Sequence, residues 1–105
     1  MTVATRSYQD EWVRGRRRSA GYRDCAGRYA AIRKELSGIR RPFSVIDLGA
    51  HAGYFSFRLA HEFSARSVAV DNYPRLKHLV RLNGDERVSL IHERLSVEQV
   101  RALGS

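Results

Sequence analysis

The stretch Phe43-Ser-Val-Ile-Asp-Leu-Gly-Ala-His-Ala-Gly-Tyr-Phe-Ser-Phe-Arg-Leu-Ala60 decides the fold of this chain. A β-branched apolar run ends at Asp47, a turn with Gly49 and Gly53 follows, and an apolar series at helical spacing comes next. The pattern changes from strand to helix across a glycine turn, as in the first βα unit of a nucleotide-binding sheet. Gly49 permits close approach of a ligand, and Gly53 lets the helix begin near the strand with its N–H groups directed at that ligand.

A second strand also ends in an acid. Ser67-Val-Ala-Val leads into Asp71, which lies 24 positions after Asp47 (71 − 47). This is close to the spacing at which such a unit places the carboxylate that accepts hydrogen bonds from ribose hydroxyls. Two acid-tipped strands joined by a glycine turn and a helix are more specific than a lone glycine motif.

The rest of the chain is predicted from its apolar spacing. Residues 1–19 are expected to form an irregular or partly helical arm, and residues 19–38 an amphipathic helix with Ser19 as N-cap. The later segments predict strands at 43–48, 67–71 and 88–92, helices at 53–64 and from Tyr73-Pro74 to Asn83-Gly84, and a short helix opened by a Ser96–Gln99 capping box.

Two motifs resemble those of class I S-adenosylmethionine-dependent methyltransferases, over roughly residues 42–95. Asp47-Leu-Gly-Ala-His-Ala-Gly-Tyr-Phe-Ser resembles their first motif and Val68-Ala-Val-Asp71 their second. The resemblance implies that Gly49 and Gly53 flank the methionine part of S-adenosylmethionine. It also implies that Asp71 holds the ribose and that Asp47 supports the turn or the cofactor's amino group.

Two further residues are candidates within this resemblance. His51 stands where the family often has a small or amide residue, and it would either bond a cofactor carboxylate or cap the helix. Glu93 is the nearest candidate for the acid that meets the adenine amine in the family. The sequence assigns no catalytic residue.

The expected fold is α/β: a truncated Rossmann-like half-domain at 42–105 with parallel strands in order 3-2-1, joined in one structural unit with an N-terminal arm and helix at 1–41. The fourth strand, whose tip usually serves the transfer step in the family, is not found in the sequence. The first strand would then lie at an edge, an aggregation liability. We expect a homo-oligomer that pairs these edges; cover by the N-terminal helix is the monomeric alternative.

The net charge of +8 is concentrated in residues 1–41, which hold eleven basic and four acidic side chains, a net +7. Arg14, Arg16, Arg17 and Arg18 lie beside Trp12 and suggest contact with nucleic acid. The alternatives are a solvated arginine cluster whose tryptophan docks on the sheet, and arginine usage that reflects coding bias.

Other classes of protein are excluded or disfavoured. Cys25 is the only cysteine, so a disulfide within the chain and a cysteine metal cluster are excluded. The four histidines lack metal-ligand spacing, and there is neither a signal peptide nor an apolar run of about 18 residues. We therefore expect a cytoplasmic protein without a metal site or a membrane partner.

Three functions remain open on the sequence. The chain would be a methyltransferase-like domain that binds S-adenosylmethionine without being an autonomous catalyst. Alternatively, it would be a degenerate module of the same fold that acts through its arginine-rich N-terminus on nucleic acid or protein. The third hypothesis is a plain truncation of a full-length enzyme.

Overall fold

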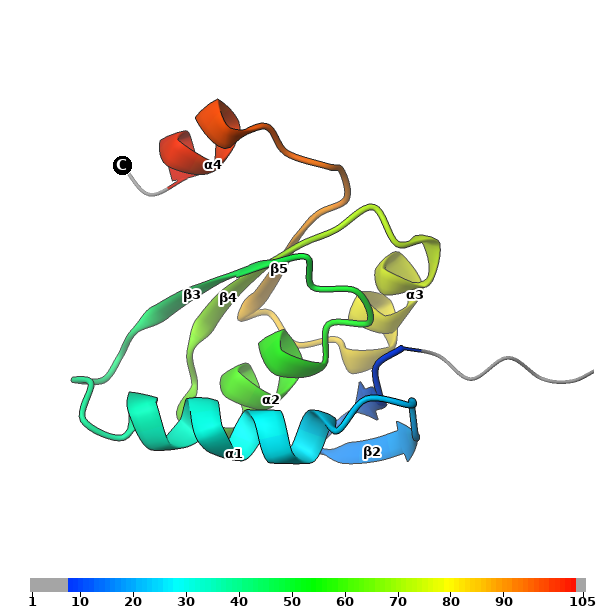
Figure 1. Cartoon of the computed structure of the whole chain (residues 1–105), viewed down its shortest axis with the longest axis vertical. Helices are drawn as coiled ribbons and strands as arrows, with labels where there is room; N and C mark the ends of the chain where they lie inside the picture. The colour runs from blue at the N-terminus through cyan, green and yellow to red at the C-terminus, as the bar shows by residue number, and fades with distance from the viewer. Residues whose placement is uncertain (1–7, 104–105) are drawn as a thin grey trace, which may run out of the picture.

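A computed structural model describes residues 8–103, so residues 1–7 of the expected arm lie outside it. Two short strands are followed by alternating helices and strands (Figure 1). The elements are β1 (Glu11–Val13), β2 (Arg16–Ser19), α1 (Cys25–Leu36), β3 (Ser44–Leu48), α2 (Tyr54–Phe63), β4 (Arg66–Val70), α3 (Pro74–Asn83), β5 (Val88–Ile91) and α4 (Val97–Leu103). Among residues 8–103, the helices include none that could serve as a membrane span.

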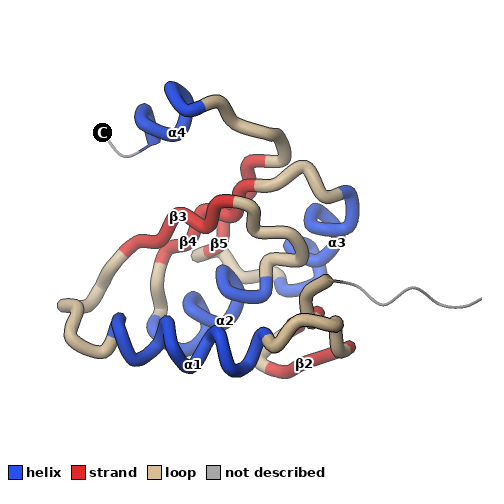
Figure 2. Tube along the Cα trace, in the orientation of Figure 1, coloured by secondary structure: helices blue, strands red, loops and turns tan. Residues whose placement is uncertain are grey.

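Strands β3, β4 and β5 form a parallel sheet with β4 in the middle and β3 at one edge. Their side chains alternate between two faces, so that Ala69 and Val88 are buried under α2 and α3, whereas Ile46 and Leu48 point to the other face. Figure 2 shows α1 and α2 together on one side of the strands and α4 on the opposite side. The expected α/β architecture, a parallel sheet flanked by helices, is confirmed.

The first two elements differ from expectation, because residues 11–19 form an antiparallel β-hairpin instead of a partly helical arm. Arg14 and Gly15 both have positive φ, 50° and 86°, as a two-residue type I′ turn requires. The hairpin is attached to α3: Asn83 Nδ2 donates to Trp12 O at 2.9 Å, and Asn83 Oδ1 accepts from Arg14 N at 3.0 Å. Arg75 on α3 also pairs with Glu11.

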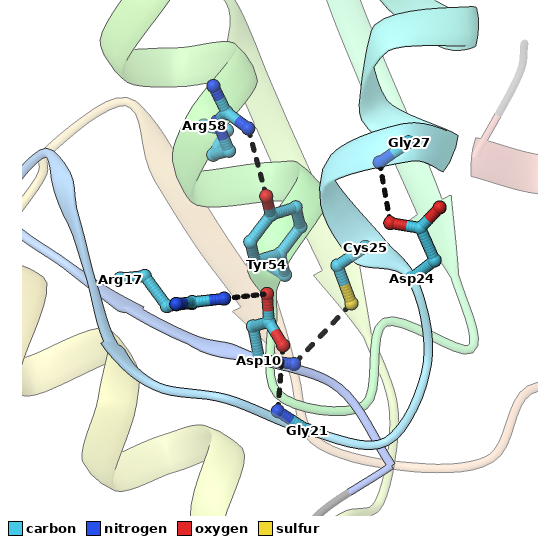
Figure 3. A network of polar contacts seen from close by, with 8 residues as sticks. All are labelled: Asp10, Arg17, Gly21, Asp24, Cys25, Gly27, Tyr54 and Arg58. Atoms are coloured by element: carbon cyan, nitrogen blue, oxygen red, sulfur yellow. Dashed lines mark hydrogen bonds and ion pairs between the residues drawn. The ribbon is translucent and has the colours of Figure 1, made fainter.

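Helix α1 begins at Cys25 and not at Ser19, because the chain before it crosses the segment around Asp10 (Figure 3). Gly21 N donates to Asp10 Oδ1 at 2.7 Å, and a Cβ on Gly21 would lie 2.3 Å from the carbonyl carbon of Gln9. Asp24 is the N-cap and accepts from Gly27 N at 2.9 Å.

Helix α1 packs on α2, where Cys25 and Tyr29 join an aromatic core with Tyr54 and Phe63. The edge strand β3 stays largely open to solvent: Ile46 and Leu48 are 41% and 53% exposed. Cover of these two side chains by α1, the alternative considered for a monomer, is therefore not found within residues 8–103.

Candidate functional site

The candidate site lies where the carboxyl ends of β3, β4 and β5 meet, the usual position of ligand sites in parallel sheets. Ala50 N donates to Val70 O at 3.0 Å, which ties the turn after β3 to the end of β4. A cavity of about 370 Å³ opens here, within the range of small-molecule sites. It is lined by Leu48, Gly49, Val70, Asp71, Asn72, Glu93, Arg94, Leu95 and Val100.

Asp71 connects the two loops that bound this cavity. Its Oδ2 accepts from His51 N at 2.8 Å, and its Oδ1 accepts from Tyr73 N at 2.9 Å. A carboxylate oxygen has two lone pairs, so each still has one acceptor position to offer a ligand. The carboxylate is thus both a structural tie and an available hydrogen-bond acceptor in the cavity wall.

The two glycines of the turn have different roles. Gly49 has φ +68°, and a Cβ built on it would meet nothing within 4 Å, so open space lies above it. Gly53 has φ +78°, and a Cβ there would lie 2.7 Å from the Phe57 ring and 3.0 Å from Leu76. Gly49 therefore faces the cavity, whereas Gly53 allows close packing behind the turn and is not among the residues that line the cavity.

Asp47 and His51 also build the turn and are not among the residues that line the cavity. Asp47 accepts from Ser56 Oγ at 2.7 Å, and burial raises the pKa of its carboxyl group despite this bond. The His51 ring stacks on Tyr73, with centroids 3.9 Å apart and planes 15° apart. Burial lowers the pKa of His51, and its buried Nδ1 has no partner among the described residues.

Gln9 contacts the turn after β3 and is a residue that no pattern in the sequence indicated. Its buried side-chain Oε1 accepts from Ala52 N at 3.1 Å and from Tyr54 N at 3.4 Å. The expectation that N–H groups near Gly53 point at a ligand is thus modified, because Gln9 already occupies two of them. No local pattern signals this contact, since Gln9 lies 43 positions from Ala52.

The structure brings together Gly49, Asp71 and Glu93 in the cavity wall and places Asp47, His51 and Gly53 behind it. The apolar side chains of the wall, from Leu48 to Val100, were also not predicted. The wall combines two acids with one arginine and four aliphatic side chains. Such a surface suits a ligand with a flat apolar part and hydroxyl or amino donors.

No protein-family model matches this chain, and no curated protein sequence matches it significantly. Among solved structures, it is similar to WbdD, in a crystal structure described as that of monomeric WbdD, with a TM-score of 0.63 and 29% sequence identity. The match covers 78% of this chain and 21% of the WbdD chain, so the chain spans about a fifth of that protein's length. This likeness supports a methyltransferase-like fold for the chain and nothing finer.

Proposed function

We propose that the cavity at the strand ends binds S-adenosylmethionine. One observation carries this proposal: the open space above Gly49 and the free acceptor positions of Asp71 belong to the same cavity. A tight turn and a carboxylate at adjacent strand ends are what an adenosine ribose needs for close approach and for hydrogen bonding of its hydroxyls. The methyltransferase-like fold agrees with this choice of ligand.

The lining residues divide into two sets under this proposal. Asp71 accepts from the ribose hydroxyls, and Glu93 accepts from the adenine amine. The aliphatic side chains of Leu48, Val70, Leu95 and Val100 lie against the flat adenine ring. The bound cofactor would supply an electrophilic methyl group. We assign none of the described residues to the binding of a methyl acceptor, so the proposal concerns cofactor binding alone.

Calorimetric titration with S-adenosylmethionine and S-adenosylhomocysteine tests the proposal. We expect saturable binding that Asp71→Asn weakens at least about tenfold, the loss of roughly one charge-assisted hydrogen bond. Asp85→Asn is the matched control, because Asp85 also accepts from the backbone N–H two residues on but lies outside this cavity. Absence of heat at high ligand concentration, or equal binding by both variants, would overturn the proposal.

A second candidate is a binding module that acts on nucleic acid through its N-terminus. The observation that favours it is the strand β2, whose residues are all exposed and which carries Arg16, Arg17 and Arg18 in succession. Guanidinium groups bind phosphates bidentately, and such binding weakens steeply with salt. Two results together would favour this candidate. Calorimetry would detect no binding of S-adenosylmethionine, and the protein would be retained on an oligonucleotide in a salt-dependent way that is lost when these arginines are neutralised.

A further inference from the structure

A second site is indicated by Arg58, a half-buried cation on the face of α2 that points away from the sheet. Its guanidinium carbon lies 3.9 Å from the ring centroid of Tyr29 and 4.5 Å from that of Trp12. Nη1 donates to Tyr54 Oη at 2.9 Å, a contact shown in Figure 3. Within residues 8–103, every ion pair between an arginine and a carboxylate involves an arginine other than Arg58. No carboxylate among these residues lies within 4.0 Å of the Arg58 guanidinium.

The lack of a counter-ion is unusual for a cation in this position. Taking a charge out of water is costly unless it is paired, and stacking on aromatic faces compensates only in part. The nearest acid along the helix, Glu62, accepts from Tyr29 Oη at 2.5 Å and pairs with Arg33 at 2.5 Å. Glu62 is therefore engaged by other groups, and the positive charge of Arg58 is not neutralised by the described residues.

A cavity of about 640 Å³ adjoins Arg58 between the hairpin, α1 and α2. The small side chains of Ala26 and Ala30 on α1 keep it open. The full lining is Trp12, Gly15, Ala26, Tyr29, Ala30, Arg33, Arg58, His61 and Glu62. The cavity shares no residue with the one at the strand ends, so it is a separate site.

The charges around this cavity favour an anion. Among the residues that line it, Arg33 and Arg58 are cationic and Glu62 is the one acid. The two aromatic rings hold the guanidinium plane of Arg58, so its ordering cost is already met before a ligand arrives. Among residues 8–103, only one of its five N–H donors has a hydrogen-bond acceptor. The remaining N–H groups form a fork of the kind that binds a phosphate.

We propose that this cavity binds the phosphate group of a small organic phosphate, with Arg58 as the principal ligand. A cavity of about 640 Å³ is larger than a phosphate needs, so it has room for the organic part of an ester beside Ala26 and Ala30. The positive field of β2 would raise the local concentration of such anions.

Titrations followed by NMR test this site directly, at the Arg58 Nε–H resonance in the parent chain and at the backbone amide resonance of Ala26 in every variant, because Arg58→Lys has no Nε–H. The probes are inorganic phosphate, adenosine monophosphate and glucose 6-phosphate, which separate the phosphate from a nucleoside or sugar contribution. We expect saturable shifts with each probe, and tighter binding of the esters than of inorganic phosphate. Arg58→Lys keeps the charge but loses the fork, so affinity should fall at least about tenfold.

Two further variants keep the test informative if Arg58→Lys fails to fold. Ala30→Glu changes an exposed helical position that lines the cavity and should abolish phosphate binding by repulsion. Arg28→Lys, on the exposed surface of α1 and outside the cavity, should bind like the parent chain. Absence of saturable shifts up to about 10 mM phosphate compound, or binding that Ala30→Glu leaves intact, would overturn the proposal.

Discussion

The two glycines of the turn after β3 provide a sharp test, because replacement by alanine should affect the site in one case and the fold in the other. Both residues have positive φ, so alanine costs about 1–2 kcal/mol of backbone strain at either position. Only Gly49 has open space where the new methyl group would lie. Gly84 also has positive φ, and its nearest contact to a built Cβ is 3.9 Å. It is the matched control for strain alone.

At Gly53 the added methyl group would be 2.7 Å from Phe57 and 3.0 Å from Leu76, and both side chains are buried and cannot move aside freely. Overpacking of this kind costs about 1–3 kcal/mol beyond the strain. Gly53→Ala should therefore lose about 2–5 kcal/mol, whereas Gly49→Ala and Gly84→Ala lose about 1–2 kcal/mol each. Since a small domain has roughly 5–15 kcal/mol in total, Gly53→Ala endangers folding.

Urea unfolding gives the stabilities, and calorimetry with S-adenosylmethionine gives the affinities. Gly49→Ala should bind at least about tenfold more weakly, because its methyl group enters the space proposed for the ligand. Gly84→Ala should match it in stability and retain full affinity. Equal affinities of Gly49→Ala and Gly84→Ala would contradict the proposed position of the ligand, and a Gly53→Ala variant as stable as Gly84→Ala would contradict the close packing at Gly53.

Three further outcomes are expected. Burial raises the pKa of Asp47, so the folded chain holds this proton more tightly than the unfolded chain, and the free energy of unfolding falls as pH rises from the ordinary pKa of 3.8 through the raised one. Asp47→Asn should remove this decline. If the difference in free energy of unfolding between parent and variant, measured by urea unfolding, does not change with pH, the expectation is contradicted. Gln9→Ala leaves two buried amide groups without their acceptor and should cost about 1–3 kcal/mol, seen as a lower Tm in a thermal melt. We propose that the exposed β3 edge pairs with a second copy of the chain, so light scattering should give twice the 12.0 kDa mass of one chain. Ile46→Lys should reduce the measured mass to that of one chain, and a single-chain mass for the parent protein would refute the proposal.

Much of the sheet and its helices could be predicted, because their signals are local. The expected strand at 43–48 and helix at 53–64 agree within one residue with β3 and α2. The capping box before α4 is also confirmed, since Ser96 N donates to Gln99 Oε1 at 2.8 Å and Gln99 N donates to Ser96 Oγ at 3.2 Å. Each of these features depends on residues a few positions apart.

The N-terminal hairpin could not be predicted in the same way, because distant residues hold it. Arg14 bonds to Asn83 across 69 positions, and Glu11 pairs with Arg75 across 64. A run of three arginines in β2 carries no strand signal of its own, and its strand partner β1 is only three residues long. Tertiary contacts with α3 thus override a weak local preference for irregular or helical structure.

The walls of the strand-end cavity differ in how firmly the protein holds them, and this difference decides what a ligand must do. The floor of the cavity, at Asp71, is held in place, because the Asp71 carboxylate accepts hydrogen bonds from the backbone N–H groups of His51 and Tyr73. It thereby joins the turn after β3 to the start of α3. The outer wall is α4, in which no residue is buried and which meets the cavity through Val100. A ligand would find its acceptors in place on the floor, and its contact with Val100 would add packing to a helix in which no residue is buried. Substitutions on the floor should therefore weaken binding more than substitutions in α4, because they remove acceptors that are already in place.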